Sequence, residues 1–179
     1  CPDFSNRINK AENYAKSYSG ILDTTEKKVL PVFLKYLKSA DEQMEEGLKF
    51  YRLAARKSPE SKRELAVREI VVAEQMQRMM QSECAILEFE DLRFQQVFEK
   101  DRNKVATILA RMENIIRDEI DRTELSMLAS LHDSRLGFQF EQDYVYTPYS
   151  LEEKLKVLRD ILKNQLPEAK RRSEERRGG

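Results

Sequence analysis

Residues 60–136 read ESKRELAVREIVVAEQMQRMMQSECAILEFEDLRFQQVFEKDRNKVATILARMENIIRDEIDRTELSMLASLHDSRL and contain neither Gly nor Pro. These two residue types are the strongest breakers of regular structure, so a run of 77 residues without them predicts unusually long helices. Steps of alternately three and four residues from Ile70 meet apolar side chains at eleven of fourteen positions. This spacing is the seam of a coiled coil, and as one helix the run would span on the order of 100 Å.

Six consecutive polar residues at 99–104 mark the place where the run bends or turns into a third helix. The seam keeps its register across them, which favours a bend. We therefore expect an all-α fold: an elongated antiparallel helical bundle or coiled coil with long kinked helices, forming one domain over residues 1–179. Because the seams carry more apolar surface than one thin hairpin covers, we also expect a homodimer. Its long helices would pair antiparallel around the seam residues Phe94, Phe98, Val105, Ile108, Met112 and Ile115.

The composition agrees with long, solvated helices. Charged residues make up 36% of the chain, and Gly and Pro occur only five times each. With 32 basic and 32 acidic residues, the net charge predicts no nucleic-acid binding. Two Cys form no disulfide framework, and we expect Cys84 to be a buried small hydrophobe. The absence of a disulfide framework favours the reducing cytoplasm, and because no run of about 18 apolar residues occurs, we expect the chain to contact membranes only peripherally.

The remaining segments follow from local signals. We expect a long helical hairpin over residues 4–133, with a kink at Pro31 and the reversal at Ser58-Pro59, where Ser58 would cap the following helix. An aromatic connector occupies 137–149. A capping box at Ser150 opens a final helix over 150–166, whose leucines need a docking surface, and a basic tail covers 167–179. The sequence leaves open whether Tyr144, Tyr146 or Thr147 is modified.

Motifs for chemistry are missing from the sequence. The single His132 has Ala129 in place of the Glu that a di-iron bundle places three residues earlier, so a solvated or capping role fits it better. No phosphate loop, zinc-spaced Cys pair or nucleophile elbow occurs. We therefore expect no catalytic residues, no metal site, no cofactor and no enzymatic activity.

Charge is unevenly distributed in spite of the zero total. Residues 49–68 carry seven basic and two acidic side chains, a net charge of +5, whereas 83–101 carry a net charge of −4. A basic hairpin tip attracts anionic phospholipid surfaces by about 1 kcal/mol per Lys or Arg. The expected lipid-binding residues are Lys49, Arg52, Arg56, Lys57, Lys62, Arg63 and Arg68.

A long, kinked, antiparallel helical hairpin with this basic tip resembles the general plan of the BAR-domain superfamily over residues 4–133. The resemblance implies a dimeric, non-enzymatic module that binds membranes. The alternative is a coiled-coil scaffold or adaptor that holds other proteins, with the aromatic connector and the Leu151 to Leu166 face as its docking surface.

Overall fold

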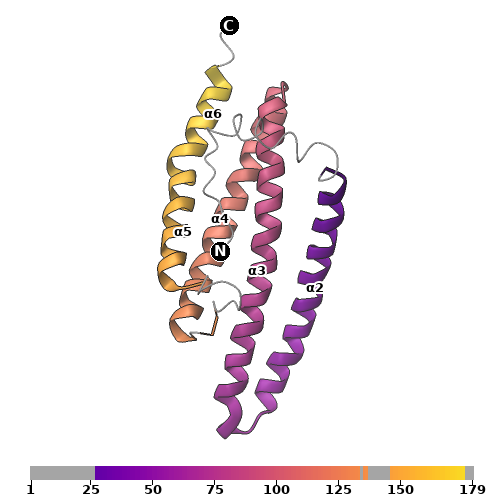
Figure 1. Ribbon diagram of the computed structural model, residues 1–179, viewed down its shortest axis with the longest axis vertical. Helices are drawn as coiled ribbons and strands as arrows, with labels where there is room; N and C mark the ends of the chain where they lie inside the picture. The colour runs from indigo at the N-terminus through magenta and orange to yellow at the C-terminus, as the bar shows by residue number, and fades with distance from the viewer. Residues whose placement is uncertain (1–26, 134, 137–145, 176–179) are drawn as a thin grey trace.

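The computed structural model describes residues 27–133, 135–136 and 146–175 of the chain. The described part is an all-α bundle without β-strands. Three long helices run antiparallel in the order α2, α3 and α4, and α5 and α6 lie along the far side of α4 (Figure 1). The helices span α2 Lys27–Lys57, α3 Glu60–Phe98, α4 Arg102–His132, α5 Pro148–Asp160 and α6 Leu166–Glu175.

The polar residues after α3 reverse the chain, and the predicted bend is wrong. The carboxylate of Glu99 accepts hydrogen bonds from the next two backbone N–H groups, both at 2.8 Å. Asp101 then caps α4 and accepts from the N–H of Asn103 at 2.9 Å. Because these side chains satisfy the backbone groups that a helix break exposes, three residues suffice for the reversal.

The seam closes within one chain. Val105, Ile108, Met112 and Ile115 are buried, as expected, and they belong to the core that the chain's own α3, α4, α5 and α6 form. Phe98 is 61% exposed because α3 ends there. The core also contains the buried apolar residues Phe89, Leu109, Ile116, Leu158, Ile161 and Leu166.

The α2–α3 hairpin is confirmed, although its cap differs from the prediction. Ser58 does not cap α3: its hydroxyl donates to the carbonyl oxygen of Ala54 at 3.0 Å and so completes the end of α2. Pro59 lies one residue outside α3, and its fixed φ ends the reversal. Helix α2 continues through Pro31, so the chain does not reverse there. The first part of the expected hairpin, residues 4–26, lies outside the described residues.

The last helix is longer than the sequence predicts. It begins at Pro148, where the Thr147 hydroxyl accepts from the N–H of Ser150 at 3.1 Å and takes the capping role assigned to Ser150. Pro167 does not stop the helix, which continues to Glu175. A π-helical turn at Ile161–Gln165 precedes that proline. We attribute this turn to Pro167, because its ring lacks an N–H and clashes with the carbonyl of a regular α-helix.

The leucine face of this helix is covered within the chain. Leu151, Leu155, Leu158 and Leu166 are each at most 2% exposed, and α5 and α6 both contact α4. The basic tail is partly fixed as well, since the Lys170 ammonium pairs with the Glu113 carboxylate of α4. The Leu151 to Leu166 face therefore does not offer the docking surface that the scaffold hypothesis gave it. The connector residues 137–145 lie outside the described part.

Candidate functional site

The tip of the α2–α3 hairpin holds the seven basic residues predicted to bind lipid. In the structure some of them form ion pairs with acidic side chains and others do not. Lys49 pairs with Glu46, and Arg52 pairs with Glu45 at 3.5 Å and with Glu74 at 3.0 Å. Glu45 and Glu46 lie just before the segment whose charge was counted, and Glu74 lies 22 residues after Arg52. The two N-terminal members of the set are therefore neutralised locally.

Four members of the set remain as exposed cations at the end of the hairpin. No ion pair within the described part of the chain engages Arg56, Lys57, Lys62 or Arg63. Arg56 and Lys57 occupy the last turn of α2, where positive charge is favoured by the helix dipole. Arg68, the seventh residue, is exposed one turn farther along α3.

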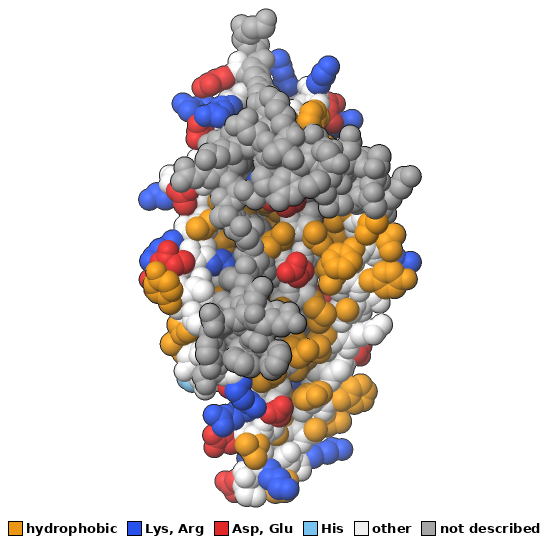
Figure 2. All heavy atoms as spheres, viewed as in Figure 1, with side chains coloured by type: hydrophobic (Ala, Val, Ile, Leu, Met, Phe, Trp, Pro, Cys, Tyr) orange, Lys and Arg blue, Asp and Glu red, His pale blue; other side chains and the backbone are white. Residues whose placement is uncertain are grey.

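Exposed apolar side chains lie in the same part of the hairpin as these cations. Phe50 is 70% exposed, Leu53 is 47% exposed and Leu65 is 61% exposed. Figure 2 shows hydrophobic, basic and acidic side chains together at the end of the molecule that the hairpin forms. The tip is thus basic and apolar at once, a combination that the charge count did not reveal.

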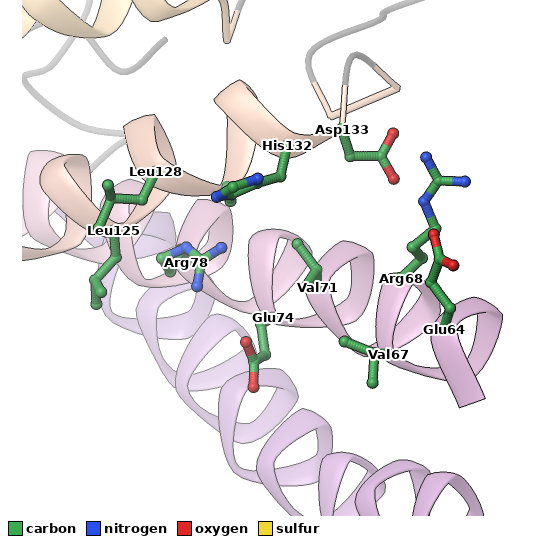
Figure 3. Close-up of a pocket in the computed structure, with 11 residues that line it drawn as sticks. Glu64, Val67, Arg68, Val71, Glu74, Arg78, Leu125, Leu128, His132 and Asp133 are labelled. Atoms are coloured by element: carbon green, nitrogen blue, oxygen red, sulfur yellow. The ribbon is translucent and has the colours of Figure 1, made fainter. Parts of the chain in front are cut away.

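A groove of about 480 Å³ lies beside the tip, between the first half of α3 and the last turns of α4 (Figure 3). Its apolar residues include Leu125 and Leu128, which are 55% and 54% exposed. Its charged residues come mainly from α3. The lining comprises Glu64, Val67, Arg68, Val71, Glu74 and Arg78 of α3, and Leu125, Leu128, Ala129, His132 and Asp133 at the end of α4.

Two acidic residues of the groove are already paired. Glu74 accepts from Arg52, and Asp133 accepts from Arg135 at 2.7 Å. The Arg135 guanidinium lowers the pKa of Asp133 to about 2. His132, the last residue of α4, is exposed, in agreement with the solvated role expected for it. Among the described residues no group of His, Cys, Asp and Glu side chains has the arrangement of a metal site.

A buried polar cluster joins α3, α4 and α5 away from the groove. Glu119 is fully buried and accepts from the Ser82 hydroxyl at 2.6 Å and from Arg122 at 2.8 Å. The Lys154 ammonium of α5 also donates to it. Burial raises the pKa of Tyr146 beside this cluster, and the Glu119 charge adds to the effect. The polar groups of this cluster find their partners within the chain. The cluster therefore positions α5 on α4.

None of the described helices combines the length and apolarity needed to cross a membrane. Comparison with protein families, with curated proteins and with solved structures gives no match. The function is therefore inferred from the geometry of the described residues, above all from the tip.

Proposed function

We propose that this chain is a non-enzymatic helical module that binds anionic lipid surfaces peripherally through the α2–α3 tip. One observation carries the proposal: Arg56, Lys57, Lys62 and Arg63 are exposed and without ion pairs in the described structure, next to exposed apolar side chains. At about 1 kcal/mol for each basic residue near the surface, four cations supply a few kcal/mol of salt-sensitive attraction. Phe50, Leu53 and Leu65 add apolar contact with the headgroup boundary.

Co-sedimentation with liposomes tests the proposal. Replacement of the four cations by Glu should abolish binding to vesicles that contain phosphatidylserine, while helicity stays unchanged because exposed charges contribute little to folding. The matched control replaces Lys100, Arg102, Lys104 and Lys163 by Glu, an equal change of charge placed away from the tip. The control should keep most of the binding. Equal losses in both variants would show that overall charge, and not the tip, attracts the vesicles.

A dimer would double the number of tips and so raise avidity. Because the predicted seam is used within one chain, we propose that a homodimer forms through another surface. The exposed face of α2 is the best candidate, with Val32 at 52%, Phe33 at 50% and Tyr36 at 69% exposure. Light scattering should then give twice the chain mass of 21.1 kDa, and Tyr36→Glu should restore a single chain's mass.

The same face of α2 favours a second candidate function, a scaffold that holds other proteins. Exposed aromatic side chains recur farther along α2 at Phe50 and Tyr51, and exposed apolar patches mark interaction surfaces. Gly47 lies in the same stripe, and an added Cβ there would meet nothing within 4 Å. No described neighbour therefore requires a glycine at position 47. A partner helix packed closely against α2 would require one, because a side chain there would hold the two backbones apart. A chain that ignores anionic vesicles at low salt would leave the scaffold as the better proposal.

A further inference from the structure

Arg78 is a half-buried cation whose charge is not met by a carboxylate. Its guanidinium donates to the side-chain oxygen of Gln75, through Nε at 3.2 Å and Nη2 at 3.0 Å. Gln75 is 3% exposed, so this contact fixes the guanidinium in place. No ion pair to Arg78 occurs within the described ranges, and burial lowers its pKa. An arginine in this position is oriented before any partner binds.

The nearest acidic residue of α3 is engaged elsewhere. Glu74 raises the pKa of Arg78 only by its charge, while its carboxylate accepts from Arg52 of α2 at 3.0 Å. At the other end of the groove, Arg135 holds Asp133. These two pairs engage Glu74 and Asp133, so no carboxylate of the groove forms an ion pair with Arg78 in the described structure.

Apolar side chains from α4 line the same groove as this charge. Figure 3 shows Leu125, Leu128 and His132 on the α4 side of the groove, at the end where Arg78 lies. An arginine without a partner can pack its aliphatic part on an apolar surface and keep its guanidinium in water. Such a role for Arg78 does not explain why Leu125 and Leu128, in the same groove, are more than half exposed. A partner that covers the leucines must also offer an anion to the guanidinium, since burial of an unmatched charge is costly.

We infer that the groove between α3 and α4 docks an amphipathic helix of a partner protein, with a carboxylate of that helix bound to Arg78. The α3 wall runs from Glu64 to Arg78, about 21 Å or four helical turns at 1.5 Å per residue. The leucines of α4 form the opposite wall, so the site has the form in which grooves receive helices with apolar residues every three or four positions. This site shares only Arg68 with the seven predicted lipid-binding residues and does not depend on lipid binding.

Two synthetic helical peptides of about 15 residues, long enough for four turns, test the inference. Both carry leucines at alternating three- and four-residue spacing, and they differ only in a central Glu or Gln beside the leucine face. Fluorescence anisotropy with the full chain should show the Glu peptide binding about tenfold more tightly, as expected for a charge-assisted hydrogen bond. Arg78→Met keeps the apolar stem and should erase the difference.

Matched variants locate the effect. Leu128→Arg should weaken both peptides, because it fills the groove, whereas Arg159→Met on α5 should change neither. Arg78→Met should also leave vesicle binding unchanged. Failure of either peptide to bind, equal affinities for the two peptides, or a persisting preference in Arg78→Met would overturn the inference. A loss of vesicle binding in Arg78→Met equal to that of the tip variant would assign the groove to lipid instead.

Discussion

Glu119→Gln should destabilise the fold more than any exposed charge substitution. The wild-type carboxylate is fully buried and neutralises Lys154, whose side chain is only 7% exposed. Breaking such a pair leaves a buried charge without its counter-ion, at a cost of about 3–5 kcal/mol. Arg122, the second cation that Glu119 binds, is 20% exposed, so water partly solvates its charge when the carboxylate is lost. We therefore expect a loss of unfolding free energy near the lower end of this range, about 3 kcal/mol.

Lys154→Met should cost less, because Glu119 keeps its contacts with Ser82 and Arg122. The expected loss is about 1–2 kcal/mol. The double variant removes both charges of the pair, so it should be more stable than the sum of the single losses predicts, by about 2 kcal/mol. Urea unfolding followed by circular dichroism measures all three free energies. Strictly additive losses would refute the conclusion that the two charges depend on each other.

The loss in Glu119→Gln should also depend on pH. Burial lowers the pKa of Lys154 below its ordinary value of 10.5, and the Glu119 charge opposes this shift. Without Glu119 the folded-state pKa falls further, so the unfolded chain binds more protons between that pKa and 10.5, and stability rises with pH there. The deficit should therefore shrink as pH rises toward the ordinary lysine pKa of 10.5. The double variant lacks this titration and should show a flatter profile.

Ile116→Ala should lower the free energy of unfolding by about 2–5 kcal/mol because it leaves a cavity in the core, whereas Phe98→Ala at an exposed helix end should cost less than about 1 kcal/mol. Comparable losses in urea unfolding would place Phe98 in a seam after all. Arg135 lowers the pKa of Asp133 from 3.8 to about 2, so this carboxylate stabilises the fold above its ordinary pKa, and the contribution is lost as pH falls through about 2. Asp133→Asn should remove that part of the acid sensitivity in urea titrations at low pH. Burial raises the pKa of the half-buried Cys84 thiol, so a maleimide should label it more slowly in the native chain than in urea, and equal rates would contradict its place beside α2.

The sequence by itself determined the elements of this protein. The absence of Gly and Pro over residues 60–136 predicts long helices, and the Ser58-Pro59 pair predicts the hairpin between two of them, both of which the structure contains. The leucine spacing after Ser150 likewise predicts a helix with one buried face. These are local properties, because propensity, turn chemistry and periodicity act within a few residues of the chain.

Only the tertiary structure decided which surfaces meet. An apolar seam shows that a face is buried but not which helix covers it, so a continuous register favoured a bend near Glu99 without excluding the observed reversal. The pairs Arg52 with Glu74 and Lys154 with Glu119 join residues 22 and 35 positions apart, beyond the reach of any local pattern. The same contacts neutralise part of the predicted basic tip and leave Arg78 without a carboxylate, because a charge's partners are set by packing and not by its neighbours in the chain.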